Sequence, residues 1–332
     1  MSPRAGTFGA IRGQEPALGF LQGALRRGRI PSAYLFLGPH HVGKRTTALA
    51  LASALNCADP AAQAEADACG ACPPCRKIAA AVHPDVETIH ADGQFIKIDQ
   101  VREVADRLAL IPFEARKRVV IVAQAERMNI QAANAFLKTL EEPPHDTLIV
   151  LCAEDARRLP ETIVSRCVPV RFRLLDAATA RELLGADGTL AGETLDFALR
   201  FAQGRLRPEL ADKAAHWMKL REEIIHGLTG LHRPMFAQLS EQIGRWAGSE
   251  DWRFVLEWLE SWFRDLALFM AGVPPERLVN GDRPAELSQC AERFSAERVQ
   301  RAYRDVLDTR GALLMNANKA LALEALWVGF KR

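Results

Sequence analysis

The sequence predicts an α/β domain, in which helices cover both faces of a parallel sheet, followed by a small helical domain and an all-α domain. Three observations support this fold class. Short β-branched runs alternate with amphipathic segments in the first half of the chain, which is typical of a parallel sheet covered on both faces. After residue 172 the strand-like runs end, and apolar residues recur at a helical spacing of about 3.6. All 6 tryptophans lie between Trp217 and Trp327, so a different core begins in that region.

The length and composition indicate a globular protein of several domains. Because one domain holds roughly 150 residues, a chain of 332 residues predicts about two to three domains. Hydrophobic residues make up 48% and charged residues 25%, which excludes a mainly disordered chain. The sequence contains neither a signal-type apolar core nor an apolar run of roughly 20 residues, so we expect a cytoplasmic protein without a membrane partner. A net charge of +2 does not attract the chain as a whole to nucleic acid.

The expected elements of the first domain follow the chain in order. Apolar, β-branched runs predict strands at 33–37, 119–123, 148–152 and 168–172. Amphipathic periodicity predicts helices at 44–55, 98–110 and 130–140. The first domain is therefore expected to cover residues 1–173.

The rest of the chain has only helical patterns. In 174–215, closely spaced glycines interrupt the helical stretches, which predicts a small bundle of short helices. Residues 216–332 contain long amphipathic stretches and predict an all-α domain. The tryptophans and leucines at helical spacing in 252–269 are expected in its core.

A phosphate-loop motif lies between the first predicted strand and the helix at 44–55. The run GPHHVGK at 38–44 fits the pattern G-x-x-x-x-G-K. Gly38 and Gly43 let the backbone amides turn toward a phosphate, and Lys44 adds a charge at the positive end of the helix dipole. These three residues, with Arg45 and Thr46, are the candidate nucleotide-binding residues.

Two features of this motif depart from what ATP hydrolysis requires. The position after the lysine normally supplies a hydroxyl to Mg²⁺, but it is Arg45, and Thr46 lies about 100° further around the helix. The strand that begins at Val119 should end in two carboxylates, one for the metal and one for water, yet it runs into Ala123-Gln124. Glu126 comes too late, and we expect it to be a solvated acid at a helix start. Weak ATP or ADP binding and a loop that retains only the shape are both open alternatives.

Four of the 7 cysteines form a metal-ligand pattern: Cys57, Cys69, Cys72 and Cys75. Two successive C-x-x-C steps bring three thiolates around one point, and the first cysteine returns as the fourth. Four thiolates suit a tetrahedral, structural Zn²⁺ and leave no position for a catalytic water. A site in which His83 replaces one cysteine, a dithiol redox pair and unliganded buried thiols are the alternatives.

Several runs carry a resemblance to a known family. AERMN at 125–129, ANAFLKTLEEPP at 133–144 and LPETIVSRC at 159–167 resemble the bacterial clamp-loader AAA+ family of DNA polymerase III. The cysteine insertion and the run NANKALALEAL at 316–326 resemble the same family, so the resemblance covers nearly the whole chain. It implies an AAA+ P-loop domain at 1–173 with a zinc insertion at 57–75, a lid at 174–215 and a helical collar at 216–332.

Within this family, an altered phosphate loop combined with an intact SRC run resembles the delta-prime subunits. The resemblance implies a rigid stator that hydrolyses no ATP, in a five-subunit ring with gamma/tau and delta subunits. It implies as partners the sliding clamp and, indirectly, the primer–template DNA onto which the ring loads it. It also implies that Arg166 is an arginine finger for the ATP of a neighbouring subunit, and that Arg207 lies at the second sensor position. The alternative for Arg166 is a surface arginine paired with a local acid.

Two other functions are open at the level of sequence. An ATP-hydrolysing subunit of the gamma/tau type would be expected to keep a complete phosphate loop and both carboxylates. A zinc-dependent DNA-binding module would require strongly salt-dependent DNA binding by the chain alone. Arg26, Arg27 and Arg29 offer a DNA contact inside a ring, although a solvated helix end is the simpler interpretation.

Overall fold

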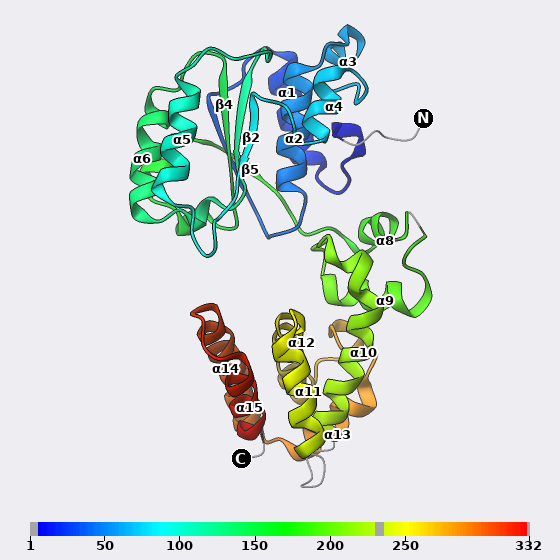
Figure 1. Ribbon diagram of the computed structural model, residues 1–332. Helices are drawn as coiled ribbons and strands as arrows, with labels where there is room; N and C mark the ends of the chain where they lie inside the picture. Colours follow the sequence, from blue (N-terminus) through cyan, green and yellow to red (C-terminus); the bar gives the residue numbers. More distant parts are fainter. Residues whose placement is uncertain (1–5, 187, 230–235, 331–332) are drawn as a thin grey trace. The chain divides into compact units, whose positions relative to one another are not determined.

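The computed structural model describes residues 6–186, 188–229 and 236–330, which belong to two compact units (Figure 1). The first unit extends to Leu183 and also contains Gly204–Arg207. The second unit contains Leu184–Gln203 and the chain from Pro208 onward. The segment predicted as a lid therefore contributes to both units, and the domain boundaries at 173 and 215 stay a prediction.

A parallel sheet of five strands forms the centre of the first unit, in the order β2-β3-β4-β1-β5. The strands are β1 (Ala33–Leu37), β2 (Val86–Ile89), β3 (Arg118–Val122), β4 (Thr147–Ala153) and β5 (Val168–Arg171). Four of them confirm the strands expected from the sequence. The sequence does not predict β2, because its short run VETI lies at the edge of the sheet and is only partly buried.

Helices cover both faces of this sheet, as predicted (Figure 1). One face carries α1 (Glu15–Arg26) and α2 (Lys44–Asn56), and the other carries α5 (Ile98–Leu108) and α6 (Ile130–Glu141). Successive side chains of a strand point to opposite faces. Ile121 therefore packs in the same core as Leu51 of α2, whereas Val120 packs in the core that contains Phe136 of α6.

Short helical segments join these elements. They are η1 (Phe8–Ala10), α3 (Pro60–Ala64), α4 (Pro73–Ala79), η2 (Ala125–Arg127), η3 (Ala156–Arg158) and α7 (Glu161–Val164). Asp59 caps α3 and Asn129 caps α6, each by accepting a backbone N–H bond from the first turn. The insertion between α2 and β2 consists of α3, α4 and their loops, and it carries the cysteine pattern.

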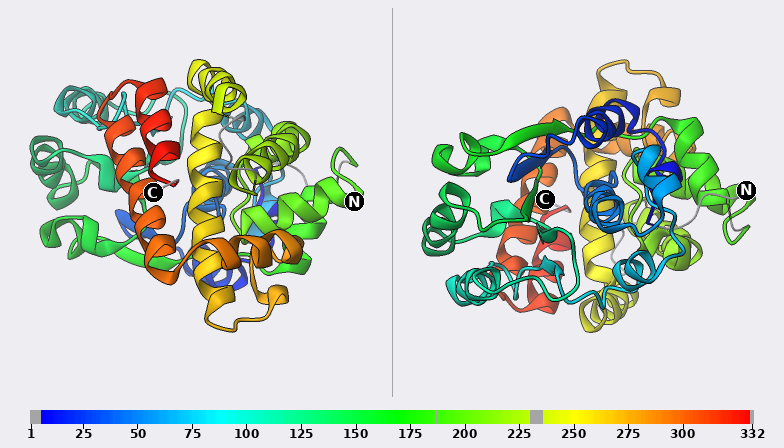
Figure 2. Two further views of the ribbon diagram at one scale, coloured as in Figure 1. Left: turned by 90° about the horizontal axis from the view of Figure 1, so that it is seen from below. Right: turned by 90° about the horizontal axis from the view of Figure 1, so that it is seen from above.

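The second unit is helical, which confirms the all-α prediction. After α8 (Ala177–Gly185), which ends at the boundary between the units, its helices are α9 (Gly192–Ala202), α10 (Glu209–Thr229), α11 (Phe236–Gly248), α12 (Asp251–Met270), η5 (Pro275–Arg277), α13 (Pro284–Arg293), α14 (Ala296–Leu314) and α15 (Lys319–Gly329). α12 lies beside α14 (Figure 2). Trp258 and Trp262 of α12 are fully buried, as expected for a core stripe. In the described ranges, none of the helices combines the length and apolar character needed to cross a bilayer.

Candidate functional site

The phosphate loop forms the turn between β1 and α2, as the sequence predicts. Gly38 has a φ of +149°, and a Cβ at this position would lie 2.4 Å from the carbonyl oxygen of Phe172. Gly43 has a φ of +98° and directly precedes α2. The structure therefore explains both glycines. At Gly38 a side chain would collide with Phe172, and at Gly43 the positive φ would strain any other residue.

Lys44 is turned into its own loop. Its side chain is buried, and Nζ donates to the carbonyl oxygens of Gly38 and Pro39, at 2.5 Å each. Burial lowers the pKa of Lys44, although the nearby Cys152 and Glu126 raise it. An ammonium has three N–H donors, and these two carbonyl groups use two of them. One N–H of the ammonium remains for a phosphate group.

The residues that follow Lys44 are arranged differently from a metal-binding P-loop. Arg45 and Thr46 are exposed, and the hydroxyl of Thr47 donates to the carbonyl oxygen of Gly43 at 2.9 Å. Leu206 N donates to the carbonyl oxygen of His41 at 2.9 Å, so the segment that precedes Arg207 lies against the loop. Nucleotide binding by these residues stays a prediction.

Glu126 differs from the sequence prediction of a solvated acid, which was wrong. Its side chain is only 7% exposed, and within the described structure neither carboxylate oxygen has a hydrogen-bond partner. His40 Nε2 lies 3.5 Å from Glu126 and 3.7 Å from Glu154, which follows β4. Burial lowers the pKa of His40, while the two carboxylates raise it. The short η2 helix turns Glu126 back toward the phosphate loop, an effect that residue spacing along the strand does not show.

The four predicted cysteines come together, and their sulfur atoms all lie within 4.8 Å of one another. Ideal tetrahedral ligation at about 2.3 Å per Zn–S bond places sulfur atoms roughly 3.8 Å apart, and Cys57 Sγ lies 3.9 Å from Cys72 Sγ. Backbone N–H groups donate to the sulfurs of Cys57, Cys69 and Cys72, as suits thiolate charge. The residues present therefore fit a four-coordinate metal.

His83 lies outside this cysteine group. Its Nδ1 accepts a bond from Asp85 N at 3.2 Å, and its Nε2 lies 3.8 Å from Glu114. The alternative in which His83 replaces a cysteine as ligand is therefore wrong, since the described metal-ligand group consists of the four cysteines.

Arg166 lies in the SRC run directly after α7, and its side chain is 35% exposed. Its Nη2 donates to Glu141 Oε1 at 2.6 Å, and its Nη1 donates to the carbonyl oxygen of Thr162 at 2.8 Å. Cys167, the next residue, is buried, and burial raises the pKa of its thiol to about 12. The arginine is thus partly accessible, whereas the thiol of the next residue is buried and protonated.

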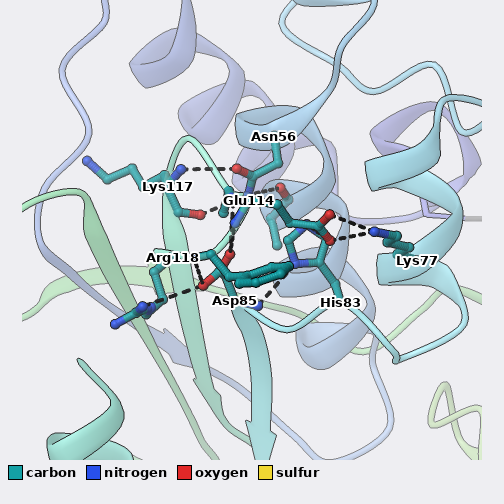
Figure 3. Close-up of polar contacts among 10 residues, drawn as sticks. Asn56, Lys77, His83, Asp85, Glu114, Lys117 and Arg118 are labelled. Carbon is teal, nitrogen blue, oxygen red and sulfur yellow. Dashed lines mark hydrogen bonds and ion pairs between the residues drawn. The ribbon is translucent and has the colours of Figure 1, made fainter. Parts of the chain in front are cut away.

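The loop at 109–117, between α5 and β3, is a feature that sequence reasoning missed (Figure 3). The buried Asp85 accepts backbone N–H bonds from Phe113, Glu114 and Ala115 at 2.8–2.9 Å. Burial opposes its ionisation, but these three bonds and Arg118 hold the pKa of Asp85 below its usual value.

Further contacts fix the same loop (Figure 3). Asn56 exchanges two hydrogen bonds with the backbone of Lys117, and Lys77 pairs with Glu114 at 2.6 Å. Despite this fixation, Ile111 and Phe113 are 90% and 84% exposed, and Leu110 beside them is also exposed. A rigid loop that shows apolar side chains to solvent is typical of a protein-binding surface. The signal in the sequence was the run LIPF at 110–113, which consists of four consecutive apolar residues.

Comparison with known proteins places the chain in a family. Residues 13–176 match the family model described as "DNA polymerase III, delta subunit", and residues 215–331 match "DNA polymerase III, delta subunit, C terminal". The chain is 31% identical to DNA polymerase III subunit delta' of Pseudomonas aeruginosa over 89% of its own length and 90% of that protein. The chain belongs to the delta-prime family of DNA polymerase III subunits.

Other DNA polymerase III subunits are similar to parts of the chain. The delta-prime subunit of Bacillus subtilis is 33% identical over 52% of this chain and 51% of that protein. Subunit tau of Escherichia coli is 35% identical over 63% of this chain but only 32% of its own length. Delta-prime membership therefore rests on a match along nearly the whole length, whereas the tau likeness is confined to part of each protein.

Proposed function

We propose that the chain is the non-hydrolysing stator of a DNA polymerase III clamp loader, which helps to load the sliding clamp onto primed DNA and supplies Arg166 to the ATP of a neighbouring subunit. The observation that carries this proposal is the phosphate loop, in which Lys44 Nζ is held by two carbonyl groups of its own loop. Membership of the delta-prime family supports the clamp-loader role.

The surroundings of the loop argue against hydrolysis in this chain. Phosphoryl transfer from ATP needs a Mg²⁺ ligand after the loop lysine and carboxylates that hold the metal and orient water. Arg45 replaces the hydroxyl residue, and β3 runs into Ala123 instead of a carboxylate. Glu126 is buried beside His40 and lies in η2, beyond the end of β3. Binding of ATP or ADP, with contacts from Gly38, Gly43 and Arg207, would at most be weak.

Arg166 has the chemistry that an arginine finger needs. A guanidinium is always charged, and its planar fork matches two phosphate oxygens at once. It lies at the surface of the first unit, partly accessible, at the position that the family resemblance assigns to the finger. In this role it would neutralise charge that develops on the γ-phosphate held by an adjacent subunit.

The partners that we propose are gamma/tau and delta subunits in a five-subunit ring, together with the sliding clamp, and the setting is the cytoplasm. Primer–template DNA would be contacted indirectly. The apolar loop with Ile111 and Phe113 is our candidate for a contact with one of these proteins, because its shape is fixed before binding and little entropy is lost on docking.

We also propose that the four cysteines hold a structural Zn²⁺. Thiolate ligands select soft or borderline metals, and a closed set of four leaves no site for chemistry. The metal would tie the end of α2 to the start of α4 and so stabilise the insertion.

The second candidate is an ATP-hydrolysing subunit of the gamma/tau type, which the likeness to subunit tau of Escherichia coli favours. Steady-state ATP hydrolysis by the isolated chain separates the two. We expect no turnover above background from the isolated chain, and in the reconstituted assembly a DNA-stimulated rate that Arg166→Ala lowers. Turnover by the isolated chain that disappears in Lys44→Ala would favour the gamma/tau-type function instead.

A further inference from the structure

The guanidinium group of Arg166 is engaged at both of its terminal nitrogens. Nη2 donates to Glu141 Oε1 at 2.6 Å, and Nη1 donates to the carbonyl oxygen of Thr162 at 2.8 Å. Ser165 Oγ lies 3.4 Å from the same Nη1. Both nitrogens at the tip of the fork therefore already have acceptors within this chain.

These acceptors come from two different elements. Glu141 is the last residue of α6, whereas Thr162 lies in α7, and the two helices pack against each other. The pair Arg166–Glu141 thus spans 25 residues of sequence. It fixes the direction of the arginine relative to the body of the first unit, which a single local hydrogen bond would not do.

A carboxylate and a phosphate compete for the same donors. Two parallel N–H bonds from one edge of the guanidinium form the strong, directional contact with either anion. Glu141 engages Nη2 and the carbonyl oxygen of Thr162 engages Nη1, so each terminal nitrogen already uses one of its N–H donors within this chain. Bidentate binding of a neighbour's γ-phosphate through both terminal nitrogens therefore competes with Glu141.

We propose that Glu141 is a restraining residue, which holds Arg166 away from the neighbouring ATP until the subunits are aligned. The inference rests on the proposed function of Arg166 as a finger that acts in trans. The side chains of Arg166 and Glu141 are 35% and 50% exposed, so water screens the pair and its strength is that of a surface ion pair. Glu141 therefore tunes the release of the finger and does not lock it.

Glu141→Gln tests the restraint, because it removes the charge and keeps the shape. In the assembly reconstituted with gamma/tau and delta subunits, primed DNA and the clamp, we expect the turnover number for ATP to rise. An exposed ion pair supports an increase of about 1.5- to 5-fold at the one ATP site that Arg166 faces, and the increase summed over all ATP sites of the ring is smaller. Glu142→Gln is the matched control. This exposed neighbour makes no side-chain ion pair among the described residues, so its removal should leave turnover unchanged.

A double variant separates restraint from a general structural effect. If Glu141 acts through the finger, Arg166→Ala with Glu141→Gln should hydrolyse ATP at the same reduced rate as Arg166→Ala alone. A Glu141→Gln assembly with unchanged or lower turnover, while Arg166→Ala still lowers it, would overturn the restraint and leave the finger intact. Unchanged turnover in Arg166→Ala itself would overturn both. Melting curves of each variant chain, which we expect to match the unaltered protein, exclude misfolding as the cause.

Discussion

Replacing Asp85 by Asn should destabilise the first unit strongly, because the carboxylate holds the loop at 109–117. Oδ1 accepts the N–H of Phe113, and Oδ2 accepts those of Glu114 and Ala115. An asparagine keeps only one acceptor oxygen. In one orientation its amide nitrogen would face the N–H groups of Glu114 and Ala115, and in the other it would face the N–H group of Phe113. Arg118, which is buried 3.5 Å from Asp85, would also lose its counter-charge.

The magnitude follows from the bonds that are lost. A hydrogen bond to a charged group contributes about 1.5–3 kcal/mol, so the loss of two gives about 3–6 kcal/mol. Relaxation of the loop into water and relief from burying the charge offset part of this loss. We expect a decrease of about 3 kcal/mol in the free energy of unfolding, or roughly 6–12 °C in the melting temperature of a unit this size.

The distribution of tryptophan makes the assay specific for each unit. All 6 tryptophans lie in the second unit, so tryptophan fluorescence follows only that unit, while far-ultraviolet circular dichroism follows both. Asp85→Asn should lower the melting temperature of the part of the dichroism signal that belongs to the first unit. The melting temperature measured by tryptophan fluorescence should stay unchanged. The control Glu114→Gln removes the surface pair with Lys77 and the charge beside His83, keeps the backbone N–H bond to Asp85, and should cost less than about 1 kcal/mol. Equal melting of Asp85→Asn and the unaltered chain would refute the assigned role of the carboxylate.

The same carboxylate gives a pH dependence of known sign. The pKa of Asp85 is lower in the folded chain than in the unfolded chain. Its contribution to stability is therefore complete above the unfolded pKa, about 3.9, and is lost as the pH falls through the folded value. The difference in stability between the unaltered chain and Asp85→Asn should accordingly shrink in acid, as measured by urea unfolding at a series of pH values.

Three further changes test the proposed sites. Elemental analysis should find about one zinc per chain in the unaltered protein and less in Cys72→Ser, and the variant should lower the melting temperature seen by dichroism but not the one seen by fluorescence. Unaltered protein without zinc would contradict this. Lys44→Ala should lower the free energy of unfolding by about 1–2 kcal/mol because two carbonyl groups lose their donor, and ATP should not raise the melting temperature of the variant or of the unaltered chain. A rise with ATP only in the unaltered chain would show that nucleotide binds. Phe113→Ser should leave melting unchanged but weaken binding to the clamp or to the other subunits at least tenfold, as measured by surface plasmon resonance; unchanged binding to all of them would exclude the loop as a docking surface.

The sequence predicts the central sheet well, because buried parallel strands are continuous apolar runs. β1, β3 and β4 have almost no exposed residues, so their β-branched and aromatic composition is a direct consequence of burial on both faces. The half-exposed β2 has no such pattern. The cysteine group was predictable for a related reason, since the close spacing of three ligands leaves the chain few ways to separate them.

The contacts that depend on distant segments were not predictable. Asp85 and the loop it holds are 28–30 residues apart, and Glu141 and Arg166 are 25 apart, with no periodicity that links them. Glu126 was placed in solvent because spacing along an ideal strand puts it beyond the site. In the structure Glu126 lies in the short η2 helix and is buried beside His40 instead. In each case the contact joins residues of different elements, which the local sequence does not relate to one another.

The two cations of the proposed mechanism are held in opposite ways. Lys44 is buried and donates to two uncharged carbonyl groups of its own loop, and the loss of both bonds costs about 1–2 kcal/mol. Arg166 is partly exposed, and its charged acceptor Glu141 can be solvated by water as soon as the pair opens, which costs at most about 1 kcal/mol. The lysine that would serve this chain's own nucleotide is therefore the harder of the two to release. This difference supports a subunit that acts on the nucleotide of its neighbour, and it makes the Arg166–Glu141 pair the contact at which that action can be adjusted.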